Sequence, residues 1–261
     1  MSVALRVTLV QPDTIWEDAA GNRRAIDAIG ATLQGATDVV VLPEMFTTGF
    51  SMEPERLSEV PEGPTLKWLR DLSRRLDVAV TGSVITLQDG RYFNRLLWVT
   101  PDGAAAHYDK RHLFRMGGED RHYTAGEHAL IVTWRGFRIA PLVCYDLRFP
   151  VWSRRRADHD YDVLLYVASW PAARRHAWRS LLVARAIENQ CYVVGVNRVG
   201  SDGHGTSHVG DSVVHDFQGR ALVELGAGPA HATIALDRRS LDEFRDRFPA
   251  QLDADRFTLL G

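Results

Sequence analysis

The chain has 261 residues, of which 45% are hydrophobic and 25% are charged, and its formal net charge is −2 at pH 7. This composition is typical of a globular protein that can bury a sizeable core, and the absence of a basic excess argues against nucleic acid as a partner. We expect a single domain over residues 1–261.

Apolar or alternating runs predict strands along most of the chain. They cover residues 3–10, 38–42, 78–85, 91–100, 104–108, 129–134, 137–143, 162–169, 191–199, 212–216, 220–225 and 232–236. Helical spacing is found at residues 16–33, 65–76, 174–189 and 240–248. We expect Asp13 or Thr14 to cap the first of these helices and Ser240 to cap the last. Residues 112–127 and the glycine-rich residues 200–210 predict loops.

The order of these segments indicates the fold class. Strands and helices alternate at first, and later strands follow strands, which predicts an α/β domain with large sheets covered by helices. No apolar run is long enough for a membrane-spanning helix, and the N-terminus lacks the pattern of a signal peptide, so we expect no membrane partner. The two cysteines do not suggest a disulfide framework, which favours a reducing compartment, the cytoplasm.

Glu44, Lys110 and Cys144 each follow the end of an apolar strand. Binding sites in open α/β sheets lie at the carboxyl ends of strands, so the three side chains could converge on one cleft. There a carboxylate could take the thiol proton, the thiolate could attack an amide carbonyl, and the ammonium could stabilise the oxyanion. The alternatives are ordinary: a buried core cysteine and two solvated surface charges.

The strand at residues 137–143 ends abruptly at Cys144, and polar residues and then Pro150 follow. Such a turn exposes the thiol at the end of a sheet, where backbone N–H groups face the sulfur. These donors lower the pKa of a thiol and can hold an oxyanion. Cys191 instead opens an apolar run, so we expect it in the core.

Three segments resemble the glutamate, lysine and cysteine motifs of the nitrilase superfamily of carbon–nitrogen hydrolases. They are residues 40–44 (VVLPE), 108–114 (YDKRHLF) and 142–150 (LVCYDLRFP). The similarity runs from residue 3 to about residue 236. It implies a four-layer αββα sandwich that forms a homodimer or a higher homo-oligomer.

The resemblance also implies roles for the site residues. Glu44 is the expected base, Cys144 the nucleophile, and Lys110 with the backbone N–H of Tyr145 the oxyanion donors. Glu119 matches a second acidic residue that recurs near the lysine in the superfamily. The reaction passes through a Cys thioester and requires no cofactor and no metal.

Within the superfamily the chain most resembles the ω-amidases, which act on 2-oxo acid amides. This likeness rests on four segments: residues 45–52, 115–116, 169–171 and 197–200. The expected reaction releases ammonia from the terminal amide of a small carboxylic acid, 2-oxoglutaramate or 2-oxosuccinamate. The alternatives are another amidase or N-carbamoyl amino acid hydrolase of the superfamily, and a non-catalytic binding module.

The carboxylate of such a substrate needs a cation, because burying it unpaired is costly. Arg115 is the expected partner and Arg148 the second candidate. The ordinary alternatives are a solvated loop charge for Arg115 and an ion pair with an internal carboxylate for Arg148. We expect Tyr145, Trp170 and Phe50 to complete the substrate-binding set.

His204 and His208 are four residues apart in the glycine-rich loop at residues 200–210. This spacing suits a metal pair only on a helix and with further ligands nearby, so we expect no metal there. The loop also lacks the spacing and the lysine of a phosphate-binding loop.

Overall fold

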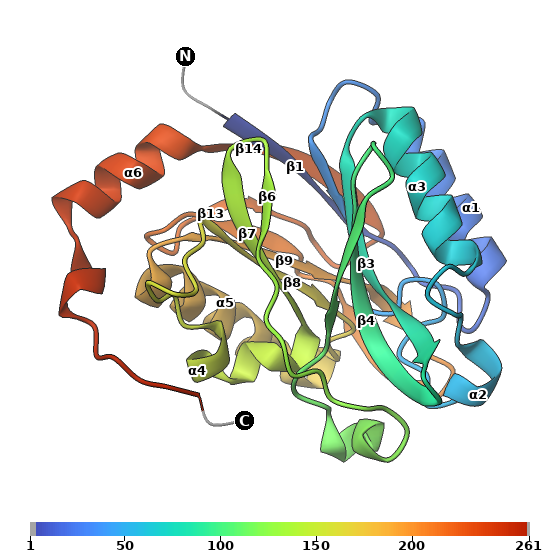
Figure 1. Cartoon of the computed structure of the whole chain (residues 1–261). Helices are drawn as coiled ribbons and strands as arrows, with labels where there is room; N and C mark the ends of the chain where they lie inside the picture. Colours follow the sequence, from blue (N-terminus) through green and yellow to red (C-terminus); the bar gives the residue numbers. More distant parts are fainter. Residues whose placement is uncertain (1–3, 260–261) are drawn as a thin grey trace.

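The structure of the chain is a computed structural model and describes residues 4–259 (Figure 1). Most of its strands belong to two six-stranded sheets. Val3, the first residue of the first predicted strand, lies outside the described residues, as do the chain ends, so the domain limits 1–261 stay a prediction.

The first sheet has the strand order β14-β1-β2-β3-β4-β5. These strands are β14 (Ala230–Asp237), β1 (Ala4–Gln11), β2 (Val39–Val41), β3 (Ala79–Gln88), β4 (Arg91–Val99) and β5 (Ala105–Asp109). The strands β1, β2 and β3 are parallel, and the flanking strands pair antiparallel. Parallel strands are buried on both faces, which explains why residues 39–41 are valines without polar alternation.

The second sheet has the order β13-β12-β9-β8-β7-β6. These strands are β13 (Ala221–Glu224), β12 (Val213–His215), β9 (Tyr192–Asn197), β8 (Val163–Ala168), β7 (Phe137–Val143) and β6 (Val132–Trp134). Again three parallel strands, β7 to β9, are flanked by antiparallel strands, one on one side and two on the other. The two sheets therefore share one strand pattern.

Helices cover the outer faces of both sheets (Figure 1). The helices α1 (Ala19–Gly30) and α3 (Pro64–Leu76) pack on the first sheet, and α5 (Arg175–Asn189) packs on the second. Gly195 permits the close approach of α5, because a Cβ atom there would lie 2.6 Å from a methyl carbon of Leu182. The largest hydrophobic core contains residues of both sheets together with residues of α5 and α6. The expected α/β class and four-layer αββα sandwich are confirmed.

Helix boundaries differ from the expectations at both ends of the chain. The first helix begins at Ala19 and not at residue 16, and its cap is Asp18, whose Oδ1 accepts from the N–H of Gly21 at 2.8 Å. The last helix, α6 (Arg238–Arg247), is capped by Asp237 and not by Ser240. The predictions of Asp13, Thr14 and Ser240 as caps were therefore wrong, because an aspartate nearer each helix start supplies the acceptor.

Short elements were missing from the expected set. They are α2 (Pro54–Leu57), α4 (Pro150–Ser153), the hairpin β10 (Val199–Ser201) and β11 (Ser207–Val209), and five 3-10 turns. The 3-10 turns are η1 (Arg115–Gly117), η2 (Glu119–Arg121), η3 (Cys144–Arg148), η4 (Ala172–Arg174) and η5 (Ala250–Asp253). Residues of η1, η3, η4 and β11 line the pocket described below.

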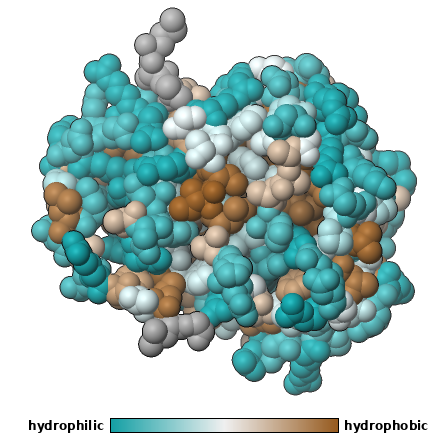
Figure 2. Space-filling model, viewed as in Figure 1, coloured by the Kyte–Doolittle hydropathy of each residue, from teal (hydrophilic) through white to brown (hydrophobic). Residues whose placement is uncertain are grey.

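The surface in the view of Figure 2 is mostly hydrophilic, with separate apolar patches. Exposed apolar side chains near the C-terminal end include Phe248, Leu252, Phe257 and Leu259. Within residues 4–259, no helix combines the length and the apolar character needed to cross a membrane.

A fully buried carboxylate joins α6 to the second sheet. Asp162, directly before β8, accepts from the backbone N–H of Arg138 at 2.9 Å. Its two oxygens also pair with Arg238 at 2.7 Å and with Arg245 at 3.0 Å. Its side chain is 0% exposed, so these partners replace the water that the charge has lost.

Replacing Asp162 by alanine should lower the free energy of unfolding by about 3–5 kcal/mol, because the buried Arg245 loses its counter-charge. Asp242→Ala is the matched control, since Asp242 pairs with Arg238 on the exposed side of α6. The control should cost about 0.5 kcal/mol or less. Urea denaturation of both variants measures the difference, and equal losses would contradict the assignment.

Candidate active site

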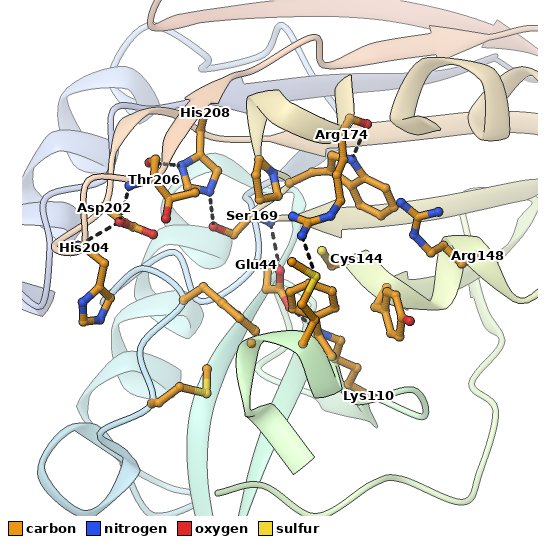
Figure 3. A pocket seen from close by; sticks show the side chains of 18 residues that line it. Glu44, Lys110, Cys144, Arg148, Ser169, Arg174, Asp202, His204, Thr206 and His208 are labelled. Atoms are coloured by element: carbon orange, nitrogen blue, oxygen red, sulfur yellow. Dashed lines mark hydrogen bonds and ion pairs between the residues drawn. The ribbon is translucent and has the colours of Figure 1, made fainter. Parts of the chain in front are cut away.

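A pocket of about 370 Å³ lies where the carboxyl ends of strands from both sheets meet. Glu44 follows β2 and Lys110 follows β5 of the first sheet, whereas Cys144 follows β7 of the second. All three line the pocket, and Figure 3 shows their side chains converging. The expected convergence of these residues on one cleft is therefore found in the structure.

Lys110 is held between two carboxylates. Its Nζ donates to Oε1 of Glu44 at 2.7 Å and to the two oxygens of Glu119 at 3.0 and 2.9 Å. The side chains of all three residues are 0% exposed. Glu119 lies behind Lys110 and does not line the pocket.

The charges of this cluster are mutually dependent. Burial alone would lower the pKa of Lys110, but the carboxylates of Glu119 and Glu44 outweigh it and raise that pKa, so the ammonium is retained. Burial raises the pKa of Glu119, although the charge of Lys110 opposes this change. The cluster holds one positive charge against two carboxylates, and additional N–H donors are therefore needed.

Neutral N–H groups donate these additional hydrogen bonds to the two carboxylates. The backbone N–H of Ser169 donates to Oε2 of Glu44 at 2.9 Å, and that of Phe114 donates to Oε2 of Glu119 at 2.6 Å. The side-chain amide of Asn94 donates to both carboxylates. Sequence reasoning missed Asn94, because it lies inside β4 with no motif around it.

Cys144 begins the turn η3, and its φ of +44° lies in the left-handed region that non-glycine residues seldom adopt. Here the structure corrects the expectation of a lowered thiol pKa. Burial, followed by the negative charge of Glu44, raises the pKa of Cys144 well above its ordinary value, and Lys110 offsets this only in part. Cys144 therefore rests as a neutral thiol and needs a base before it can act as a nucleophile. Cys191 is buried in the core, as expected.

Asp146 connects the lysine segment to the cysteine turn. Its Oδ2 accepts from the hydroxyl of Tyr108 at 2.7 Å and from the backbone N–H of Val143 at 3.0 Å. Its Oδ1 accepts from the backbone N–H of His112 at 3.0 Å. This fully buried carboxylate thus fixes the distance between the loop that carries Lys110 and the turn that carries Cys144.

Some of the predicted substrate-binding residues line the pocket and one does not. Phe50, Tyr145 and Trp170 line the pocket. Arg115 does not: its side chain is 84% exposed and pairs with Asp120 at 2.8 Å. The 3-10 turn η1 directs Arg115 toward solvent, so the structure does not bring it to the place where a bound carboxylate would need a partner.

Two other arginines line the pocket, Arg148 and Arg174 (Figure 3). The guanidinium of Arg148 lies 5.0 Å from the ring centroid of Trp170. That of Arg174 lies 5.2 Å from the ring centroid of Phe114. Within residues 4–259, no carboxylate lies within ion-pair distance of either group. Nη2 of Arg174 donates to Sδ of Met116 at 2.9 Å, and the other donors of the two guanidinium groups remain available to an anion.

His204 and His208 also line the pocket, on the hairpin β10–β11. His208 is buried, and its ring nitrogens lie 3.0 Å from the carbonyl oxygen of Thr206 and 3.3 Å from Oγ of Ser169. Burial, then the charge of Arg198, lowers the pKa of His208, so its ring is neutral. In the described part of the chain, no group of three or more His, Cys, Asp or Glu side chains is placed to hold a metal ion.

Comparisons with known proteins agree with this geometry. A family model described as carbon-nitrogen hydrolase matches residues 6–246. The omega-amidase YafV of Yersinia enterocolitica is 49% identical over 257 residues, which are 98% of this chain and 99% of that protein. A 2-oxoglutaramate amidase of Bacillus subtilis (strain 168) is 33% identical over 215 residues, which are 81% of this chain and 83% of that protein.

A solved structure supports the same relationship. The crystal structure of XC1258 from Xanthomonas campestris, a CN-hydrolase superfamily protein with an arsenic adduct in the active site, is 50% identical to this chain. The match has a TM-score of 0.96 and covers 98% of this chain and 99% of that one.

Replacing Lys110 by methionine should lower the free energy of unfolding by about 3–5 kcal/mol at neutral pH, because two buried carboxylates lose their shared cation. Adding Glu119→Gln should restore part of this loss. Lys67, the only other lysine of the chain, is exposed on α3, and Lys67→Met is the control with no expected effect. Urea denaturation of the variants gives the comparison, and a Lys110→Met protein as stable as the control would contradict the ion cluster.

Proposed function

The chain belongs to the carbon–nitrogen hydrolase family, and from this premise we propose that it is an ω-amidase. It releases ammonia from the terminal amide of a short 2-oxo acid, 2-oxoglutaramate or 2-oxosuccinamate. The observation that carries the proposal is the pocket in which Glu44, Lys110 and Cys144 meet. Two arginines line the same pocket, and within residues 4–259 neither forms an ion pair with a carboxylate. The names of the relatives from Yersinia and Bacillus favour this substrate class.

Acylation begins with the neutral thiol of Cys144. Glu44 takes the thiol proton, and the sulfur attacks the carbon of the terminal amide. The charge that develops on the amide oxygen is stabilised by Lys110 and by the backbone N–H of Tyr145. When the intermediate collapses, the C–N bond breaks, Glu44 returns the proton to the leaving nitrogen, and ammonia departs from a thioester.

Deacylation uses the same groups, with water in place of the thiol as the proton donor to Glu44. Glu44 takes a proton from water, and the resulting hydroxide attacks the thioester carbon. The C–S bond breaks, the carboxylic acid leaves, and the proton returns to the sulfur of Cys144. Glu119 stays beside Lys110 and holds its ammonium in place through the two hydrogen bonds. The cycle needs no redox change and no cofactor.

The substrate carboxylate is the second part of the proposal. Arg174 and Arg148 have guanidinium groups at the pocket, whereas Arg115 faces solvent. A guanidinium can bind a carboxylate through two parallel hydrogen bonds, and the rings of Trp170 and Phe114 keep these cations in place. We therefore assign the binding of the substrate carboxylate to Arg174 and Arg148. Arg115 serves as the control residue in the experiment below.

The proposal also covers the oligomeric state of the protein and its place in the cell. Exposed apolar side chains on α4 and in the C-terminal segment, such as Val151, Phe257 and Leu259, would be covered in a homodimer or a higher homo-oligomer. The two free cysteines suit the reducing conditions of the cytoplasm. Another amidase, or an N-carbamoyl amino acid hydrolase, remains the alternative that a substrate panel distinguishes.

The wild-type protein should release ammonia from 2-oxoglutaramate or 2-oxosuccinamate faster than from glutamine, asparagine, an N-carbamoyl amino acid or a simple nitrile. Cys144→Ala should abolish release, because no thioester can form, and Cys191→Ala should keep most of it. Coupled ammonia assays measure the panel. Activity that survives Cys144→Ala, or no activity on any 2-oxo acid amide, would contradict the proposal.

Arg174→Ala and Arg148→Ala should each raise KM for the 2-oxo acid amide roughly 10- to 100-fold, the effect of losing a hydrogen bond to a charged group. KM for a short uncharged aliphatic amide should change little. Arg115→Ala is the matched control and should behave as wild type on both substrates. If Arg115→Ala alone raises KM for the 2-oxo acid amide, the carboxylate belongs to Arg115, as expected from the sequence.

A further inference from the structure

Asn94 is a buried polar residue in the middle of β4, opposite Ile85 of β3. It is 0% exposed and does not line the pocket, so a bound substrate does not contact it. Its side chain is directed at the ion cluster. Asparagine weakens a strand, and a residue of this kind in the core therefore needs a reason.

The amide of Asn94 is shared between the two carboxylates. Its Nδ2 donates to Oε1 of Glu44 at 2.8 Å and to Oε1 of Glu119 at 3.1 Å. The carbonyl oxygen of its main chain accepts from the backbone N–H of Lys110 at 3.0 Å. Its own Oδ1 is buried and has no hydrogen-bond partner within the described residues. Only the donors of this side chain are used, which suits two ionised neighbours.

The donors are distributed unevenly over the carboxylate oxygens. Among the backbone and amine donors of residues 4–259, Lys110 and Asn94 donate to Oε1 of Glu44, whereas the N–H of Ser169 alone donates to Oε2. Both oxygens of Glu119 accept from two donors each. A carboxylate oxygen has two lone pairs in its plane, so Oε2 of Glu44 is the oxygen with one left free.

We propose that Asn94 is a positioning residue: by donating to Oε1 of Glu44 and of Glu119, it stabilises the negative charge of both carboxylates and leaves Oε2 of Glu44 to exchange the proton with Sγ of Cys144. The proposal rests on the proposed function, in which Glu44 is the base. In the step itself, the S–H bond of Cys144 breaks and an O–H bond forms on Oε2. The proton later leaves Oε2 for the amide nitrogen.

Other titratable groups face this cluster. Lys110 approaches from the end of β5, Cys144 from η3, and Tyr123 from the segment after η2. The Tyr123 hydroxyl donates to the carbonyl oxygen of Ser51, and the charges of Glu119 and Glu55 add to burial in raising its pKa, so it stays neutral. None of these groups replaces the donor that Asn94 supplies. Without it, the carboxylates should bind protons more readily.

The test is Asn94→Leu, which has a similar volume and no donor, assayed with the 2-oxo acid amide. We expect kcat to fall roughly 10- to 100-fold, as for a lost hydrogen bond to a charged group, with KM within about twofold. The acidic limb of the kcat/KM profile against pH should move to higher pH by about one unit, because the base is protonated more easily. A residue with only a structural role would leave that limb in place.

Thr81→Val is the matched control. Thr81 is buried on β3 of the same sheet, and its hydroxyl has no partner within residues 4–259. The control should keep the wild-type kcat and pH profile. If Asn94→Leu does not fold, Asn94→Ala removes the same donor and is measured instead. An unchanged acidic limb, a kcat equal to that of the control, or loss of folding in both Asn94 variants would overturn the proposal.

Glu44→Gln separates this inference from the proposed function. If Glu44→Gln is inactive and the Asn94 variants keep the wild-type profile, the base is correct and only the role of Asn94 is wrong. If Glu44→Gln releases ammonia at a near-normal rate, the proposed function itself fails.

Discussion

The burial of the Lys110 ammonium between the carboxylates of Glu44 and Glu119 is the constraint on which the rest of the site depends. Charges removed from water are tolerated only with close partners, and the cluster satisfies this with hydrogen bonds of 2.7–3.0 Å. The same enclosure raises the pKa of Cys144 and leaves a neutral thiol in the pocket that Glu44 also lines. The contacts that stabilise the buried charges therefore also determine the protonation state of the Cys144 thiol.

The sandwich brings this cluster together from distant parts of the chain. Glu44 and Lys110 follow strands of the first sheet, and Cys144 follows a strand of the second, so the site exists only when the two sheets pack face to face. The left-handed conformation of Cys144 turns the chain sharply at the strand end. Asp146 then fixes this turn to the lysine segment with hydrogen bonds of 2.7–3.0 Å.

Much of this arrangement could be predicted from the sequence, because apolar strands that end in reactive residues are a local pattern. The fold class, most strands and the convergence of Glu44, Lys110 and Cys144 were all anticipated. The positions of Asn94 and Arg174 at the site were not, since they come from contacts with residues far along the chain. The exposed position of Arg115 was not anticipated for the same reason: its direction is set by a short 3-10 turn, which residue spacing does not indicate.

The most direct test of the central claim, a thioester on Cys144, is mass spectrometry of the wild-type protein quenched with acid during turnover of 2-oxoglutaramate. A thioester intermediate predicts an adduct with the mass of the substrate less ammonia, located by peptide mapping on the fragment that contains Cys144. It also predicts that the adduct disappears once the substrate is consumed. Ammonia release without any adduct on Cys144, or an adduct on Cys191, would contradict it.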